Sequence, residues 1–133
     1  INAVLLRDVN DDEAVELLEW ALAQGHELRF IEAMPLDAQG GWSRERMVTA
    51  DEILAGLRGR YDLDPEPGRG SAPAERFVVR SHPGGPVVGR VGVIASVTRP
   101  FCGACDRLRL TADGQLRNCL FATAESDLRT PLR

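Results

Sequence analysis

The stretch "NAVLLRDVNDDEAVELLEWALAQGHELRFIEAM", residues 2–34, contains two kinds of apolar pattern. Its start (2–7) and its end (28–34) are short apolar runs of the length of a buried strand. Between these runs, apolar residues recur at helical spacing and charged residues occupy the opposite side, which predicts an amphipathic helix. Strand, helix and strand in this order form a βαβ unit, with parallel strands and a right-handed crossover.

Capping residues mark the ends of the predicted helix. Asn10, followed three positions later by Glu13, resembles a capping box and predicts that the helix begins directly after Asn10. Gly25 predicts its end, because glycine commonly follows the last helical turn. The face expected to point toward the core carries Val15, Leu18 and Leu22.

The region after the second strand begins with a long loop. Pro35 opens this loop, which runs over 35–47 at the carboxyl end of the strand, where parallel α/β folds bind their ligands. Thr49 and Glu52 predict a capped second helix. Residues 64–76, rich in proline, glycine and alanine, predict a flexible connection.

Beyond this connection the pattern changes to short apolar runs separated by glycine-rich turns, which predicts a β-rich segment. The strands are expected within residues 77–80, 86–97 and 108–120. The last residues, 125–133, predict the start of a helix. The expected organisation is an α/β part over 1–63, a connection over 64–76 and a β-rich part over 77–133.

Composition and charge narrow the function classes. The content of 44% hydrophobic and 27% charged residues is typical of a globular protein. The net charge of −4 argues against general binding to nucleic acid. No apolar run is long enough to span a membrane, and no secretory leader is visible. We therefore expect a cytoplasmic protein, and the start within a strand predicts that the sequence begins inside a domain.

The stretch "RPFCGACDRLRLTADGQLRNCLF", residues 99–121, contains all three cysteines in the spacing C-x2-C-x13-C. An odd number without a secretory signal argues against a disulfide framework. A structural zinc site would need a fourth ligand, for which only His26 and His82 are available. Buried or redox-active thiols are a second interpretation. An iron–sulfur cluster accounts best for three ligands, because thiolates bind such clusters and one iron stays open to substrate.

The residues between the cysteines suggest the ligand. Strand alternation predicts that Cys105, Arg107 and Arg109 share one face, with Leu108 and Leu110 facing the core on the other. The chain has sixteen basic residues, all arginine, whose planar guanidinium binds phosphate and guanine edges through paired hydrogen bonds. The cysteine segment therefore predicts an anionic or purine ligand.

The turn of the following hairpin decides which way Cys119 faces. A two-residue turn at Asp113–Gly114 would place Cys119 on the face of Leu108. A three-residue loop, with Gly114 in the left-handed conformation, pairs Thr111 with Gln115 and Cys119 with Arg107 instead. We predict the three-residue loop.

Three stretches carry a resemblance to a known family: "INAVLLRDVNDDEAVELLEWA", "ELRFIEAMPL" and "FCGACDRLRLTADGQLRNCLF". Together they resemble the C-terminal portion of the MoaA family, the radical-SAM GTP 3',8-cyclases of molybdenum cofactor biosynthesis. The family usually has Asn after the second cysteine, where this chain has Asp106. The resemblance implies the last strands and helices of an incomplete TIM-type barrel, followed by a β-rich segment that binds a cluster.

The resemblance also implies a reaction. In this family an N-terminal 4Fe–4S cluster cleaves S-adenosylmethionine to a 5'-deoxyadenosyl radical, which takes hydrogen from C3' of GTP. C3' then bonds to C8, which gives (8S)-3',8-cyclo-7,8-dihydroguanosine 5'-triphosphate. A second 4Fe–4S cluster, bound by three cysteines, holds the guanine at its open iron.

Carried onto this chain, the resemblance implies three groups of site residues. The ligands of the substrate-side cluster would be Cys102, Cys105 and Cys119. GTP would contact Arg107, the Leu108 backbone and Arg109. Met34 would line the adenine of S-adenosylmethionine, and no residue of this chain is assigned to the chemical step itself.

Two family features are missing, namely the N-terminal CxxxCxxC motif of the radical-generating cluster and the C-terminal Gly-Gly tail. We therefore expect a fragment without cyclase activity of its own, whose partners are GTP, the missing N-terminal part and a second copy in a homodimer. A zinc-stabilised binding module with His82 as fourth ligand, and a redox protein using Cys102 and Cys105, remain as alternatives.

Overall fold

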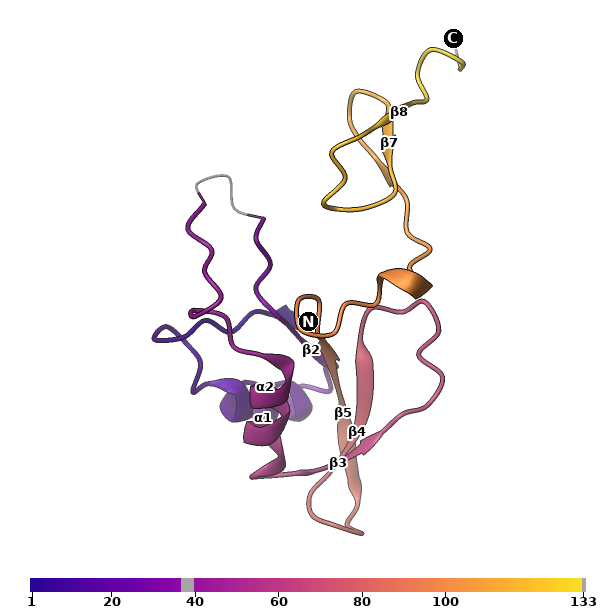
Figure 1. Ribbon diagram of the computed structural model, residues 1–133. Helices are drawn as coiled ribbons and strands as arrows, with labels where there is room; N and C mark the ends of the chain where they lie inside the picture. Colours follow the sequence, from indigo (N-terminus) through magenta and orange to yellow (C-terminus); the bar gives the residue numbers. More distant parts are fainter. Residues whose placement is uncertain (37–39, 133) are drawn as a thin grey trace. The chain divides into compact units, whose positions relative to one another are not determined.

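The computed structural model describes residues 1–36 and 40–132. Contacts divide the chain into two compact units, Ile1–Gly103 and Ala104–Arg133 (Figure 1). The connection that the sequence predicts at 64–76 lies within the first of these units. Within the described residues, none of the helices has the length and apolar character needed to cross a membrane.

The first unit is a mixed α/β fold built on a five-stranded sheet. Its elements are β1 (Asn2–Ala3), α1 (Ala14–Ala23), β2 (Leu28–Ile31), α2 (Ala50–Arg58), β3 (Asp62–Pro65), β4 (Glu75–Arg80) and β5 (Val87–Ile94). The strand order is β1-β2-β5-β4-β3, with β1, β2 and β5 parallel and β3, β4 and β5 antiparallel. The predicted parallel strands on either side of the first helix are therefore confirmed.

The core lies between one face of this sheet and the two helices, which lie together on one side of it in Figure 1. Alternate strand residues such as Phe30, Val79 and Val91 are fully buried on that face. Leu18 and Leu57 meet them from the helices. Removing large aliphatic and aromatic side chains from water is the main term that holds this unit together.

The segment 64–76 connects two strands of the one sheet. It includes the end of β3 and the start of β4, which pair along their length. Glu66, in the connection, accepts a 2.7 Å hydrogen bond from Arg90 of β5, and its backbone N–H donates to the Arg76 carbonyl. The connection is therefore tied to the sheet by polar contacts.

Helix α1 begins later than the sequence predicted. Its N-cap is Glu13, which makes no side-chain capping bond, so the expected cap at Asn10 is wrong. The Asn10 side chain instead accepts from the Leu6 N–H and donates to the Val4 carbonyl. These partners hold a turn between β1 and α1, which competes with capping for the same amide group. Gly25, with φ of 69°, follows the helix end as predicted.

Helix α2 matches its prediction. The Thr49 side chain accepts from the Glu52 N–H, and the Glu52 carboxylate accepts from the Thr49 N–H, which completes the capping box. The flanking strands are shorter than expected: β1 covers 2–3 of the predicted 2–7, and β2 ends at Ile31. Met34 therefore lies in the loop that follows β2.

The second unit is a small antiparallel sheet of β6 (Arg109–Leu110), β7 (Gln115–Arg117) and β8 (Ser126–Asp127). A short 3₁₀ helix, Cys102–Ala104, precedes it at the unit boundary. The Thr111 N–H donates to the Gln115 carbonyl at 2.9 Å, and Gly114 has φ of 85°. The predicted three-residue hairpin loop is therefore confirmed.

Two other expectations for this region are wrong. Residues 125–133 do not begin a helix. Ser126 and Asp127 form the strand β8 instead, which pairs with the backbone of β7. Leu108 and Leu110 do not face a core, since 70% and 65% of their surface is exposed. The β6–β7 ladder consists of Arg109–Arg117 and Leu110–Leu116, so Arg107 and Cys119 lie beyond its end.

Candidate functional site

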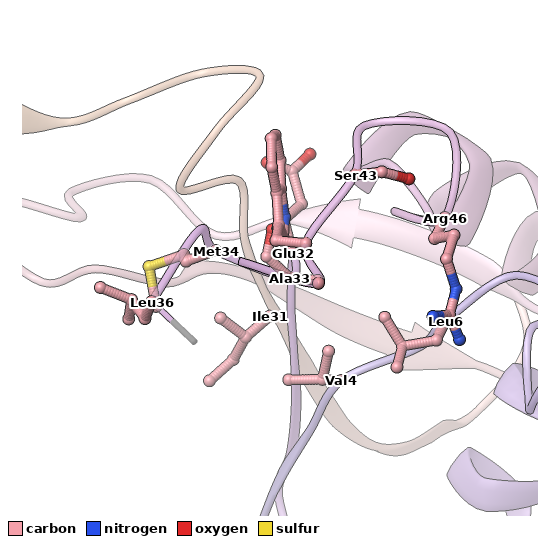
Figure 2. Close-up of a pocket in the computed structure, with 11 residues that line it drawn as sticks. Val4, Leu6, Ile31, Glu32, Ala33, Met34, Leu36, Ser43 and Arg46 are labelled. Carbon is pink, nitrogen blue, oxygen red and sulfur yellow. The ribbon is translucent and has the colours of Figure 1, made fainter. Parts of the chain in front are cut away.

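A pocket of about 420 Å³ lies where β1 and β2 end, in the first unit (Figure 2). Its wall is mainly apolar, with Val4, Leu6, Ile31, Met34, Leu36 and Trp42. Ser43 and Arg46 add polar groups from the loop that follows β2. A concave apolar site with a few polar groups is the usual form of a small-molecule pocket. Met34 is thus placed in a pocket at the strand ends, where the sequence predicted a ligand.

Trp42 fixes the described part of the loop against the sheet. Its indole Nε1–H donates to the Ala33 carbonyl at 2.8 Å, and the ring is only partly exposed. Residues 37–39 of the predicted loop lie outside the described residues. The hydrogen bond places a rigid aromatic side chain beside the Met34 pocket.

Glu32 is a buried carboxylate that the sequence analysis did not single out. Only 1% of its surface is exposed. Its Oε1 accepts from the Ala50 N–H at 2.8 Å and from the Thr98 hydroxyl at 2.5 Å. Its Oε2 accepts from the N–H groups of Val97 and Thr98, each at 2.8 Å. A carboxylate with four donors has all its main acceptor positions filled.

The ionisation of Glu32 follows from these contacts. Burial by itself raises the pKa of this carboxyl, because an apolar surrounding disfavours the charged form. The hydrogen bonds from Thr98, Ala50 and Val97 outweigh burial and hold the pKa below its usual range. Glu32 is therefore charged at neutral pH. The one sequence signal was an acidic residue directly after an apolar strand.

In the second unit, Arg107 contacts the side chain of Cys105. The Arg107 Nε–H lies 3.4 Å from the Cys105 Sγ. This hydrogen bond, with smaller contributions that include the charges of Arg107 and Arg109, lowers the pKa of the Cys105 thiol. Cys119 Sγ accepts from the Phe121 N–H at 3.4 Å. The Arg107 donor therefore favours the thiolate of Cys105, the form that binds metals.

Arg109 has an unsatisfied donor. Its Nη1 is buried and has no hydrogen-bond partner within the described parts of the chain. A buried donor without a partner costs free energy, and a charged one costs more. An anionic or carbonyl-bearing ligand would remove this cost. The observation fits the predicted role of Arg109 in binding such a ligand.

Among the described residues, the three cysteines do not form one group of metal ligands. Cys102 is exposed at the end of the first unit, whereas Cys105 and Cys119 belong to the second. Among residues 1–36 and 40–132, no group of three His, Cys, Asp or Glu side chains has the arrangement of a metal site. His82, the alternative fourth ligand, lies in the β4–β5 turn with Nδ1 3.1 Å from the Pro83 carbonyl. Joint ligation by the cysteines stays a prediction.

The family model Molybdenum Cofactor Synthesis C matches residues 26–133, and the chain belongs to this family. The resemblance to the C-terminal portion of the MoaA family is thereby confirmed.

Curated relatives agree with this assignment. The chain is 64% identical over its whole length to the GTP 3',8-cyclase of Streptomyces coelicolor, of which it covers 38%. It is 53% identical to the GTP 3',8-cyclase of Paenarthrobacter nicotinovorans and covers 39% of it. It is 52% identical to GTP 3',8-cyclase 2 of Mycobacterium tuberculosis and covers 37% of it. The chain thus spans less than two fifths of these relatives.

Proposed function

We propose that this chain is the C-terminal, substrate-binding part of a GTP 3',8-cyclase, in which Cys102, Cys105 and Cys119 bind a 4Fe–4S cluster. The buried Nη1 of Arg109, which has no hydrogen-bond partner among the described residues, is the observation that carries the proposal; Arg109 begins β6, four residues after Cys105. The relatives' names and the family match support the reaction class.

The thiols fit a cluster by their donor chemistry. Cys105 has a lowered thiol pKa, and Cys119 already accepts a backbone hydrogen bond. Cys102 is three residues from Cys105, a span of at most about 11 Å along an extended chain. The cluster, when bound, would offer one iron without a protein ligand to the guanine of GTP.

The arginines would bind and orient GTP. Arg109 would donate its free Nη1–H to an oxygen of the nucleotide, and Arg107 would add positive charge beside Cys105. Charge-assisted bonds to phosphate are stronger than neutral ones and are often paired. The Leu108 backbone between them would contact the same ligand.

The Met34 pocket would bind the adenine of S-adenosylmethionine. Met34 and Trp42 provide the apolar wall that an adenine ring needs, at the ends of parallel strands. The parallel β1-β2-β5 arrangement is compatible with the last strands of an incomplete TIM-type barrel. As the family resemblance implies, a second 4Fe–4S cluster and the radical chemistry would belong to the N-terminal part of the enzyme.

The isolated chain is expected to form no cyclic product from GTP, because it has no CxxxCxxC motif. The expected partners are the N-terminal part of the enzyme, GTP and a second copy in a homodimer, and the expected compartment is the cytoplasm. Detectable cyclisation by the isolated chain under anaerobic conditions would contradict this expectation.

The first experiment is anaerobic reconstitution of the chain with iron and sulfide, followed by iron and zinc analysis and an electronic spectrum with and without GTP. Four irons per chain and a spectrum that changes with GTP would support the proposal. One zinc per chain and no iron would favour the zinc-stabilised binding module without catalysis.

Arg109→Gln tests the GTP contact in the reconstituted chain. We expect GTP binding to weaken about tenfold or more, because the variant loses a charge-assisted hydrogen bond. Arg117→Gln is the matched control, since Arg117 already pairs with Glu125. Equal affinities for the Arg109 and Arg117 variants would argue against the proposed role of Arg109.

A further inference from the structure

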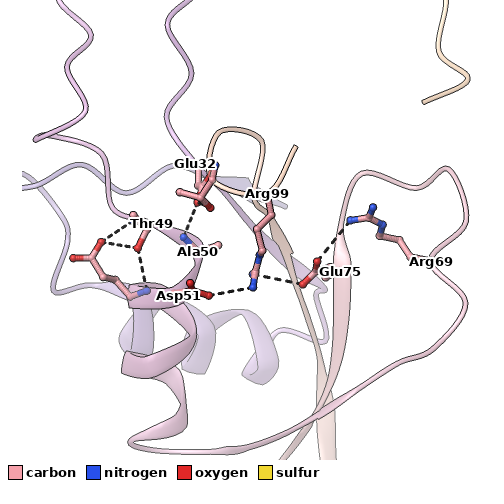
Figure 3. A network of polar contacts seen from close by, with 9 residues as sticks. Glu32, Thr49, Ala50, Asp51, Arg69, Glu75 and Arg99 are labelled. Atoms are coloured by element: carbon pink, nitrogen blue, oxygen red, sulfur yellow. Dashed lines mark hydrogen bonds and ion pairs between the residues drawn. The ribbon is translucent and has the colours of Figure 1, made fainter. Parts of the chain in front are cut away.

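Glu32 joins three segments that are far apart in the sequence. It follows β2 and accepts from Ala50 at the start of α2 (Figure 3). It also accepts from Val97 and Thr98 after β5. All three segments belong to the first unit. The carboxylate therefore fastens the turn after β5 to the body of the unit.

That turn leads directly to the cysteine motif. Residues 96–101 contain no helix or strand and connect β5 to Cys102. Within the turn, Ser96 N–H donates to the Ile94 carbonyl and Arg99 N–H donates to the Ala95 carbonyl. The N–H groups of Val97 and Thr98 donate to Glu32. Loss of the carboxylate would leave two backbone donors without their acceptor, which is costly in a partly buried turn.

Arg99 also connects the same turn to the rest of the first unit, but through weaker ion pairs. Its guanidinium lies 3.1 Å from the Asp51 carboxylate and 3.6 Å from that of Glu75. The Asp51 side chain is 78% exposed and that of Arg99 42% exposed, so water and salt screen these pairs. The buried carboxylate is therefore the stronger anchor of the turn.

We propose that Glu32 is a positioning residue for the cysteine motif: it holds residues 96–98 and thereby fixes where Cys102 leaves the first unit. Glu32 also lines the Met34 pocket, so the same residue contributes to that pocket and anchors the turn before Cys102. The link to cluster binding rests on the proposed function, whereas the anchoring of the turn does not.

Amide hydrogen exchange on the full chain without metal tests the anchoring. In Glu32→Gln, the side-chain NH₂ would oppose one of the backbone donors. We expect the Val97 and Thr98 amides to exchange about tenfold or more faster, beyond any change in β4 amides, because bonds to a charged acceptor are lost. Thr98→Val, which removes the hydroxyl donor alone, should give a smaller change of the same kind.

Two controls separate anchoring from general destabilisation. Arg99→Gln removes the exposed ion pairs of the same turn and should change these two amides little. Val79→Ala opens a cavity at a fully buried site in β4 and should accelerate exchange through global opening, with no excess at Val97 and Thr98. Equal acceleration everywhere in Glu32→Gln would overturn the inference.

Iron content per folded chain after anaerobic reconstitution gives the second measurement. We expect Glu32→Gln to bind several-fold less iron than Val79→Ala, although both are destabilised. Normal iron content in Glu32→Gln would overturn its positioning role. An iron-free wild type would instead refute the proposed cluster, and the exchange measurement would still decide whether Glu32 anchors the turn.

Discussion

Single side chains set the chemistry of this chain through a few short contacts. The Arg107 guanidinium at 3.4 Å favours the thiolate of Cys105, and four donors favour the carboxylate of Glu32. In both cases a hydrogen bond to the charged form outweighs the effect of the surroundings. The two groups differ in burial, since Glu32 is buried and Cys105 is partly exposed.

Arg107→Gln should raise the pKa of the Cys105 thiol, because the hydrogen bond from Arg107 is the largest cause of its lowering. The measurement is the pH dependence of alkylation in a Cys102→Ser, Cys119→Ser background, where Cys105 is the remaining thiol. The midpoint should move to higher pH. Arg109→Gln is the control and should move it less, since Arg109 acts through charge alone. Equal shifts would contradict this explanation.

At the level of elements, capping and turn chemistry hold the short helices and strands in place. The α2 capping box uses both the backbone and the side chain of Thr49. The Glu52 carboxylate also accepts from Arg7 at 2.7 Å, which ties the segment after β1 to the start of α2. Because each element has few residues, such local bonds make up a large share of what keeps it formed.

Glu52→Gln should destabilise the chain at neutral pH by about 0.5 kcal/mol, because Gln can still complete the capping box but loses the negative charge at the start of α2. Hydrogen bonds from Thr49 and Arg7 lower the Glu52 pKa to about 2. A lowered folded-state pKa adds stability above the unfolded pKa of about 4.3, and this stability is lost as pH falls toward 2. The difference between wild type and variant in urea unfolding should therefore shrink between about pH 4.3 and pH 2.

Arg7→Gln separates the cap from the ion pair. It removes the exposed contact with Glu52 and leaves the Thr49 bonds in place. We expect a smaller loss of stability at neutral pH than for Glu52→Gln, because exposed ion pairs are screened. A larger loss for Arg7→Gln would mean that the ion pair, and not the cap, stabilises α2.

At the scale of the molecule, stability is concentrated in the core of the first unit. Buried side chains from both helices and four strands form one cluster there. The second unit presents exposed leucines, and its short strands are joined by few backbone pairs. Small antiparallel sheets without a sizeable apolar core are marginal in water.

Leu57→Ala and Leu108→Ala delete the same atoms at these two kinds of site. Leu57 is fully buried, so we expect a loss of about 2–5 kcal/mol in the free energy of unfolding of the first unit. Leu108 is 70% exposed and should change stability by less than about 0.5 kcal/mol. Urea denaturation followed by tryptophan fluorescence measures the first unit, which contains Trp20 and Trp42, and amide exchange in β6 and β7 measures the second. A comparable loss at Leu108 would show that its side chain is buried in solution.

Local patterns predicted much of what the structure shows. The Thr49 capping box, the Gly25 helix end and the Gly114 hairpin depend on residues within a few positions of each other, and the parallel strands around α1 were predicted from two local apolar runs of strand length. Asn10 shows where this reasoning fails, because its partners lie on the preceding turn and replace the expected cap. The pairing of Ser126 with β7 was missed for the same reason.

The sequence by itself determined the βαβ unit, the hairpin register and the set of three thiols with flanking arginines, because periodicity, turn residues and spacing are local properties. Only the tertiary structure decided that β3 and β4 extend the first sheet, that Leu108 and Leu110 are exposed, and that Glu32 joins β2 to the turn before Cys102. These features depend on partners up to 66 residues apart, as between Glu32 and Thr98. Long-range partners of this kind are selected by packing and by the need to satisfy buried polar groups.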